Sequence, residues 1–349
     1  MKRTIATAVV FALVFTLTAC ATKAQNRYEA DFLILFDTKT TIVGYAPTKE
    51  EFTKFANMIH DDLETYHQLY DIYHDYEGVN NIKTINDNAG VKPVKVDRKI
   101  IDLLAFSKKE YYDSQGEMNI AMGSVLSIWH KYREDGLANP DSAQLPPEED
   151  LIAASAHMNI EDLVIDEGNS TVFLKDSKMS LDVGSVAKGY ATEQVCRDAE
   201  KQGYKSGLVS VGGNVRAIGR NDVTGKPWNV GIQNPDMESP EKDIVLVKAE
   251  DSAVVTSGDY QRYYWVDGKK YHHLIDKDTL YPSTYFTAVT ILCKDSGVAD
   301  ALTTAIYNMP FEDGLKFIEA RPGLEAMWVF KDGTMQYSPH FKDYLTEIK

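Results

Sequence analysis

Apolar residues in the first part of the chain follow two different spacings. The segment from Ala30 to Tyr45 is rich in β-branched and aromatic residues, which predicts a strand or a hairpin. Thr48 and Glu51 come next as a capping box, the signature of a helix start. Apolar residues then continue at helical spacing, at Phe52, Phe55, Ile59 and Leu63. We therefore expect a helix of about 25 residues after Thr48.

Two further helices are expected before residue 160. One begins near Asp97 and should end before Gly116, because glycine commonly follows the last turn of a helix. Its inward-facing positions are Ile100, Ile101, Leu104 and Phe106. Pro146 and Pro147, with the acidic residues after them, have the composition of a first helical turn.

From Leu181 onward, segments typical of strands and helices are interspersed. We expect helices over residues 183–202 and from Asp295 or Ser296 to Met309, and strands over 207–211, 215–218 and 286–293. Asp267-Gly268 predicts a hairpin, and Asp332-Gly333 a final turn. There is no regular βαβ rhythm and no G-x-G-x-x-G or Walker A loop. The prediction is an α+β fold of mixed sheets with packed helices, in one unit over residues 30–349.

The start of the chain has the features of an export signal. Lys2 and Arg3 precede an apolar run over residues 5–17, which is shorter than the roughly 20 residues of a membrane span. The run ends at Leu17-Thr18-Ala19-Cys20, which resembles the lipobox of bacterial lipoproteins. We expect residues 1–19 to be a signal peptide, Cys20 to be lipidated, and residues 20–29 to form a tether. An ordinary cleaved signal with an incidental cysteine is the alternative.

Charge and cysteine content exclude several classes of protein. With 37 Lys and Arg against 52 Asp and Glu, the net charge is -15 and no basic stripe is present, which argues against nucleic-acid binding. Besides Cys20 the chain contains Cys196 and Cys293, nearly a hundred residues apart. We interpret both as buried thiols and expect no disulfide framework and no zinc or redox pair.

Asp300 and Thr304 are the candidate metal ligands that spacing suggests. They lie four residues apart in a predicted helix, so both side chains project from one face. A carboxylate and a hydroxyl on one face are ligands of the kind that Mg²⁺ prefers. The simpler interpretation is that Asp300 favours the positive helix end while Thr304 bonds back to a carbonyl.

Two other segments contain groups that suit phosphate chemistry. Asp182 and Lys188 flank a glycine-containing helix start, where free N–H groups, the helix dipole and the lysine attract phosphate. By itself this segment favours an ordinary strand-to-helix turn with an exposed lysine. His272 and His273 should point to opposite faces of a strand, so one of them is a candidate base and the other packs. Spacing alone favours helix packing for Tyr73, as for Tyr66 and Tyr70.

Five segments in the second half of the chain together resemble the ApbE-type FAD:protein FMN transferases. They occur in the order of that family: LDVGSVAKGY (181–190), VSVGGNVRAIG (209–219), TSGDYQR (256–262), HHLID (272–276) and ADALTTA (299–305). The similarity covers nearly all of residues 30–340. It implies an ApbE-like, T-fold-like catalytic unit that transfers FMN from FAD to a threonine or serine hydroxyl of an acceptor flavoprotein and releases AMP.

The resemblance also implies roles for individual residues. Asp300 and Thr304, with backbone carbonyls near Ser185 and Gly297, would bind Mg²⁺. His273 would lie beside the reacting phosphate as the base, with Asp182 as the alternative. Residues implied to contact FAD are Asp182, Lys188, Glu117, Met118, Asn119, His273, Phe36 and Tyr73. Family members are commonly periplasmic or lipid-anchored, which matches the start of this chain. Together they imply a location at the outer face of the bacterial cytoplasmic membrane and an extracytoplasmic acceptor with a threonine-containing motif.

Some positions depart from the family pattern. Phe36-Asp37-Thr38 replaces an early Met-Gly-Thr, and Asn119-Ile120 replaces an Asp-Pro. Lys277 stands where a proline often follows the histidine motif, and Thr279-Leu280 replaces Thr-Gly, so the turn there should differ. Two alternatives remain: a FAD pyrophosphatase that releases free FMN and AMP, and a lipoprotein that binds flavin without catalysis.

Overall fold

The computed structural model describes residues 25–346 of the chain. The predicted signal peptide and Cys20 lie outside the described residues. The first strand, β1 (Asn26–Phe32), begins before the predicted start of the domain at residue 30, because all seven of its residues pair with β2 (Thr40–Ala46). The predicted tether over 20–29 is therefore too long at its C-terminal end. Within 25–346 no helix is long and apolar enough to cross a membrane.

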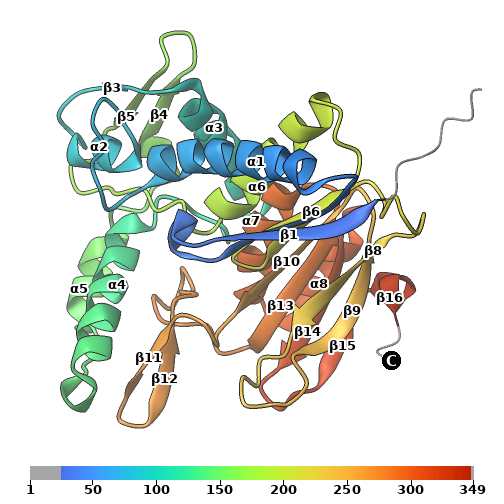
Figure 1. Cartoon of the computed structure of the whole chain (residues 1–349). Helices are drawn as coiled ribbons and strands as arrows, with labels where there is room; N and C mark the ends of the chain where they lie inside the picture. Colours follow the sequence, from blue (N-terminus) through green and yellow to red (C-terminus); the bar gives the residue numbers. More distant parts are fainter. Residues whose placement is uncertain (1–24, 347–349) are drawn as a thin grey trace, which may run out of the picture.

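An antiparallel sheet of eight strands forms the centre of the molecule (Figure 1). Its order is β1-β2-β6-β7-β10-β13-β14-β15, and every neighbouring pair is antiparallel. The remaining strands of this sheet are β6 (Gly207–Val211), β7 (Asn214–Ile218), β10 (Ala253–Gly258), β13 (Phe286–Cys293), β14 (Glu325–Phe330) and β15 (Met335–Tyr337). The predicted hairpin near residues 30–45 and the predicted strands 207–211, 215–218 and 286–293 are confirmed.

Helices cover one face of this sheet and a second sheet covers the other. On the helical face α7 (Ser296–Tyr307) packs on β10 and β13, α6 (Ala187–Lys201) packs beside α7, and α1 (Lys49–Tyr70) lies on α6. The last helix, α8 (Phe311–Glu319), packs on β14. The opposite face buries side chains of a small sheet in the order β16-β9-β8, formed by β8 (Trp228–Gln233), β9 (Asp243–Ala249) and β16 (Leu345–Thr346).

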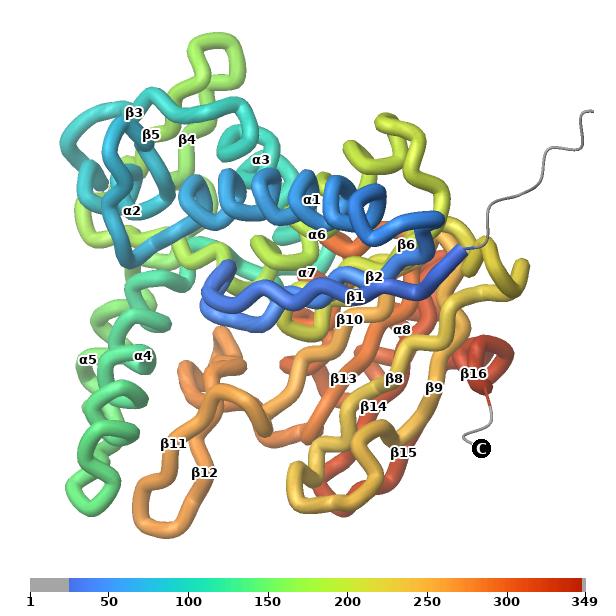
Figure 2. The backbone as a smooth tube through the Cα atoms, in the orientation of Figure 1, coloured from blue at the N-terminus to red at the C-terminus, as the bar shows by residue number. Residues whose placement is uncertain are grey.

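A helical lobe extends from one end of the main sheet (Figure 2). Its small sheet has the order β3-β5-β4, and the hairpin β11–β12 packs on α4. The bounds are α2 (Ile82–Asp87), β3 (Val94–Lys95), α3 (Arg98–Asp113), α4 (Gly123–Ala138), α5 (Glu148–Ser155), β4 (Leu163–Asp166), β5 (Thr171–Leu174), β11 (Tyr263–Val266) and β12 (Lys269–His272). Short 3-10 turns occur at Leu35–Asp37, Pro140–Ser142, Ile160–Asp162 and Phe341–Tyr344.

Local capping determines several helix starts as predicted. Thr48 Oγ1 accepts the Glu51 N–H, and the side chains of Asp97 and Asp295 cap α3 and α7. The helix predicted over 183–202 starts only at Ala187, because the Asp182 carboxylate accepts the Gly184 N–H and holds the preceding residues in a turn. Helices α2, α4 and α8 were not predicted. β12 ends at His272, so His273, which was expected in the same strand, lies just beyond it.

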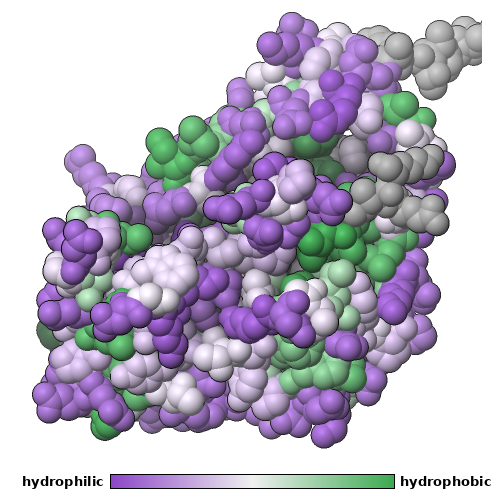
Figure 3. Space-filling model, turned by 90° about the horizontal axis from the view of Figure 1, so that it is seen from below, coloured by the Kyte–Doolittle hydropathy of each residue, from purple (hydrophilic) through white to green (hydrophobic). Residues whose placement is uncertain are grey.

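The surface of the molecule is mixed in character. Figure 3 shows hydrophilic atoms over much of the face seen from below, with hydrophobic patches separated by polar ones. Among the described residues Cys196 and Cys293 are free and buried, as predicted from the cysteine content.

Candidate functional site

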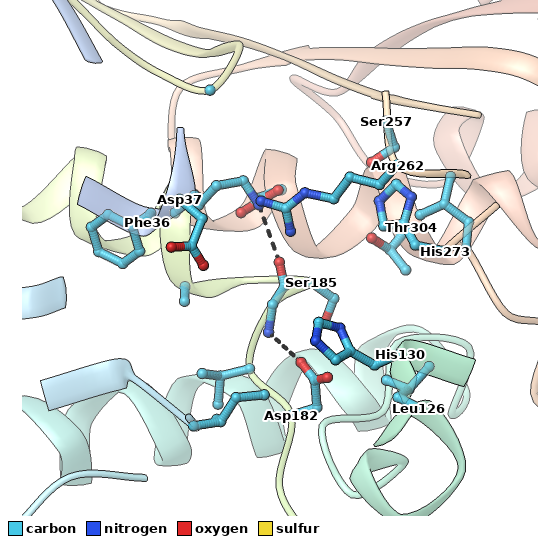
Figure 4. Close-up of a pocket in the computed structure, with 18 of the residues that line it drawn as sticks. Phe36, Asp37, Leu126, His130, Asp182, Ser185, Ser257, Arg262, His273 and Thr304 are labelled. Carbon is cyan, nitrogen blue, oxygen red and sulfur yellow. Dashed lines mark hydrogen bonds between the residues drawn. The ribbon is translucent and has the colours of Figure 1, made fainter. Parts of the chain in front are cut away.

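A cavity of about 520 Å³ lies where the sheet, α6, α7 and the helical lobe meet. Its walls bring together segments from almost the whole described chain, from the β1–β2 loop to α7. Ten of the twelve residues that the sequence and the resemblance suggest for ligand, metal or catalysis line it: Phe36, Tyr73, Glu117, Asn119, Asp182, Ser185, Lys188, His273, Asp300 and Thr304. Figure 4 shows Arg262, His273 and Thr304 gathered on one side of this cavity and Asp182 and His130 on the other.

Met118 and Gly297 are the two suggested residues that do not line the cavity. The Met118 side chain is fully buried in the hydrophobic core. Gly297 lies in the first turn of α7 against α6, where a Cβ atom would be 3.1 Å from Tyr190 Cα. Close packing of the two helices therefore explains the glycine at 297.

Asp300 is held at the cavity wall by the contact between α6 and α7. Its side chain is almost completely buried, and Oδ2 accepts the Gly189 N–H at 2.8 Å. Burial raises the pKa of Asp300, and the charge of Lys188 and the Gly189 N–H oppose the rise. Thr304 lies one turn later in α7 and lines the same cavity, as the spacing predicted.

The turn before α6 places Asp182 and Lys188 at the cavity. The Asp182 N–H donates to the Ile120 carbonyl at 2.8 Å, and its Oδ1 accepts the Gly184 N–H at 2.8 Å. Lys188 is the second residue of α6, and its ammonium folds back to donate to the Gly184 carbonyl at 3.2 Å. The predicted helix start with a lysine in its first turn is therefore present, and it faces the cavity.

The two adjacent histidines point in different directions, as predicted. His272 is buried, with Nε2 donating to the Ser283 carbonyl at 2.8 Å and Nδ1 accepting the Leu274 N–H at 3.2 Å. Burial lowers the pKa of His272 to about 4, so this ring is neutral and structural. His273 lines the cavity instead.

His273 has the protonation state that a proton acceptor needs. Burial lowers its pKa well below the ordinary value, and the positive charges of Arg262, Arg133 and Lys188 lower it further. Its Nδ1 is buried without a hydrogen-bond partner among residues 25–346, which leaves Nε2 as the nitrogen that can reach the cavity. The ring is therefore neutral near pH 7.

Two arginines in the cavity wall were not predicted. Arg262 belongs to the segment TSGDYQR, so its motif was recognised but not its role. Arg133 comes from α4, and its guanidinium approaches His130 Nδ1 at 2.6 Å. Burial lowers the pKa of Arg133, and the charge of Arg262 adds to this effect. Nothing in the sequence pointed to Arg133, because α4 itself was missed.

Two aromatic side chains, Phe36 and Tyr73, form another part of the cavity wall. Tyr73 follows the end of α1 and stacks on His130, with ring centroids 4.9 Å apart and 25° between the planes. The prediction from spacing that Tyr73 packs like Tyr66 and Tyr70 is therefore wrong, since only those two lie within α1 and in the core. Phe36 comes from the 3-10 turn between β1 and β2.

The altered turn after the histidines has its own ion pair. Lys277 Nζ lies 3.3 Å from Glu117 Oε1, which ties this turn to the cavity wall. Leu280 takes a left-handed φ of 62° where the resembled pattern has glycine. Leu280 thus adopts the kind of backbone conformation that glycine favours, and the expectation that this turn differs from that of the family stays a prediction.

Fold and cavity together define an α+β protein with a deep, polar ligand site whose wall contains three cationic side chains, Lys188, Arg133 and Arg262. The chain belongs to the ApbE family, whose family model matches residues 36–328. The expected resemblance and the α+β fold are thereby confirmed.

Two curated relatives match this chain over most of their own length. A FAD:protein FMN transferase of Klebsiella pneumoniae is 30% identical over 270 residues, which is 76% of this chain and 81% of that protein. A FAD:protein FMN transferase of Treponema pallidum is 31% identical over 75% of this chain and 74% of that protein.

Solved structures agree with the fold. The ApbE protein of Thermotoga maritima superposes with a TM-score of 0.80 at 29% identity, over 92% of this chain and all of that one. The flavin transferase ApbE of Vibrio cholerae has a TM-score of 0.76 at 24% identity over 92% of this chain and all of that one, a likeness of fold.

Proposed function

We propose that this chain transfers FMN from FAD to a threonine or serine hydroxyl of an acceptor protein, with Mg²⁺ as the metal ion and AMP as the second product. The enzyme class expected from the sequence, a FAD:protein FMN transferase, is confirmed by the curated relatives. The observation that carries the detailed proposal is the meeting of Asp300, Lys188 and a neutral His273 in one cavity, although 112 positions separate the first two in sequence.

Asp300 and Thr304 fit a magnesium ion chemically. Both offer oxygen atoms, and a buried carboxylate whose pKa is raised by burial gains stability from a nearby cation. The Ser185 carbonyl is a further candidate ligand, since Ser185 also lines the cavity. When bound, Mg²⁺ would neutralise phosphate charge and make phosphorus more electrophilic.

The cationic side chains Lys188, Arg133 and Arg262 suit the pyrophosphate of FAD. Among residues 25–346 none of the three forms an ion pair with a carboxylate, although the chain is strongly acidic. An anionic ligand would supply the missing counter-charge.

His273 is proposed as the base. The acceptor oxygen forms a bond to the phosphorus of the FMN half while the bond from that phosphorus to the bridging oxygen breaks. The acceptor proton passes to Nε2 of His273, and AMP leaves with the bridging oxygen. Asp182 is the alternative base, but its Oδ1 already accepts the Gly184 N–H, so we assign it the binding of FAD.

Incubation with FAD, Mg²⁺ and an acceptor protein tests this function. We expect covalent flavin on the acceptor and an equal amount of AMP, and loss of both after chelation of the metal. Free FMN and AMP with no flavin on the acceptor would identify a pyrophosphatase instead. Covalent flavin on this chain itself would identify a flavin carrier.

Asp300→Ala tests the metal site, with Asp61→Ala as a matched control on the exposed surface of α1. Loss of a metal ligand should lower turnover by orders of magnitude. The control should behave as the wild type. FAD cleavage at the wild-type rate by Asp300→Ala would remove the metal assignment.

The location of the protein is a second part of the proposal. We infer that Cys20 is lipidated after removal of residues 1–19, which places the enzyme at the outer face of the bacterial cytoplasmic membrane with an extracytoplasmic acceptor. Mass spectrometry of the mature amino terminus checks this. A mature chain with an unmodified Cys20 would contradict it.

A further inference from the structure

The loop that presents Phe36 to the cavity has an unusual backbone. Ile34, Phe36 and Asp37 have φ values of 95°, 55° and 53°. Left-handed conformations of non-glycine residues are strained and persist only when the surroundings impose them. The loop therefore depends on contacts outside itself.

His67 of α1 supplies such a contact. The Phe36 N–H donates to His67 Nδ1 at 3.2 Å, and the two rings meet edge to face with centroids 5.6 Å apart. Because Nδ1 accepts this bond, the proton of the neutral ring lies on Nε2. Nε2 faces the Tyr76 hydroxyl at 3.4 Å and can donate to it.

The chain of hydrogen bonds continues to Asp71. The Tyr76 hydroxyl donates to Asp71 Oδ2 at 2.8 Å. Asp71 Oδ1 also accepts the Tyr73 N–H at 2.6 Å and the His74 N–H at 3.2 Å. Burial alone would raise the pKa of Asp71, but these hydrogen bonds outweigh burial and lower it, so the carboxylate stays ionised.

One hydrogen-bonded chain thus connects both aromatic walls of the cavity. Asp71 holds the backbone of Tyr73 where it leaves α1, and through Tyr76 and His67 it reaches the backbone of Phe36. The donors and acceptors run in one consistent direction, from Nε2–H to the Tyr76 oxygen and from the Tyr76 O–H to the carboxylate.

We propose that His67, Tyr76 and Asp71 are positioning residues that hold Phe36 and Tyr73 as the walls of the subsite for the planar flavin ring. Both aromatic side chains line the cavity, and stacking on aromatic faces is the ordinary way to bind a planar ring. The inference rests on the proposed function for the identity of the ligand. It adds residues outside the five recognised segments.

Tyr76→Phe is the decisive variant, because it removes only the hydroxyl that joins His67 to Asp71. Binding of FMN and AMP is measured separately, FMN by quenching of flavin fluorescence and AMP by calorimetry. We expect the affinity for FMN to fall about tenfold, as for one lost hydrogen bond, and that for AMP to stay unchanged. With FAD as substrate, KM should rise while kcat changes little.

Two further variants separate positioning from general damage. His67→Gln retains an acceptor for the Phe36 N–H and a donor for Tyr76, so it should recover most of the affinity that His67→Leu loses. Tyr112→Phe removes another tyrosine hydroxyl that is bound to a carboxylate, that of Glu161, on a residue that does not line the cavity. It should bind FMN as the wild type does.

Unchanged FMN affinity in Tyr76→Phe would overturn the inference, and so would an equal loss of FMN and AMP affinity. If the wild-type protein binds neither FAD nor FMN, the proposed function fails and this inference fails with it. A wild type that transfers FMN together with an unaffected Tyr76→Phe leaves the function intact and refutes only the positioning role.

Discussion

Replacing Gly189 by alanine should separate α6 from α7 at the point where Asp300 enters the cavity. A Cβ atom at 189 would lie 2.3 Å from Asp300 Cβ and 2.3 Å from the Ser296 carbonyl oxygen. Ordinary contacts begin near 3.4 Å, so the helices must part by about 1 Å. The bond from the Gly189 N–H to Asp300 would lengthen with them.

The expected cost follows from this displacement. Overpacking of this kind lowers the free energy of unfolding by about 1 to 3 kcal/mol, and the higher helix propensity of alanine returns at most about 1 kcal/mol. A shift of about 1 Å in a catalytic group can lower the rate on the order of a hundredfold. A hundredfold lower rate corresponds to about 2.7 kcal/mol of activation free energy, so we expect effects of similar size on the rate and on stability.

Gly314→Ala in α8 is the matched control, because a Cβ atom there meets nothing closer than 3.6 Å. It should raise the free energy of unfolding by up to about 1 kcal/mol and leave the rate unchanged. Thermal unfolding and the rate of AMP release from FAD, measured over a titration with Mg²⁺, test both variants. Gly189→Ala with the stability and rate of the wild type would refute the reasoning.

Three more predictions follow from single groups. Burial lowers the pKa of His272 from 6.5 to about 4. The contribution of its neutral ring to the free energy of unfolding is therefore complete above pH 6.5 and is lost as the pH falls toward 4. The free energy of unfolding should drop by about 3 kcal/mol over that range, and His272→Gln should show a flatter dependence in urea titrations. Ile34→Gly relieves the strain of a φ of 95° and should raise the free energy of unfolding by about 1 kcal/mol. The control Leu33→Gly, at a position without a positive φ, should lower the free energy of unfolding. Equal melting temperatures of the two variants would contradict this. Burial and, after it, the charge of Arg262 lower the pKa of His273, so kcat/KM should stay constant as the pH falls to about 6.5. Arg262→Gln removes one of these charges and should shift the acidic side of the profile of kcat/KM against pH to higher pH. An unchanged profile would argue against His273 as the base.

Features that depend on neighbouring residues were predicted well. The capping of α1, α3 and α7 and the turn at Asp267-Gly268 were all correct, because each depends on side chains and backbone within a few positions. The same holds for Asp300 and Thr304, whose common face follows from helical periodicity alone.

Features that depend on distant segments were missed. Gly123 and Gly136 weaken the helical signal of α4, yet both are required by contacts from elsewhere. A Cβ atom at Gly123 would lie 2.4 Å from the Ser180 carbonyl oxygen, and one at Gly136 would lie 2.6 Å from the Tyr264 ring. Arg133 reaches the cavity only through this helix and so remained undetected.

The sequence by itself determined the mixed α+β class, the main elements, the family and ten of the residues that line the cavity. Only the tertiary structure decided that Met118 and Gly297 do not line it and that Arg133 does. The reason is physical. Local spacing specifies the direction of a side chain relative to its own helix or strand, whereas burial and charge depend on which distant segments pack against it.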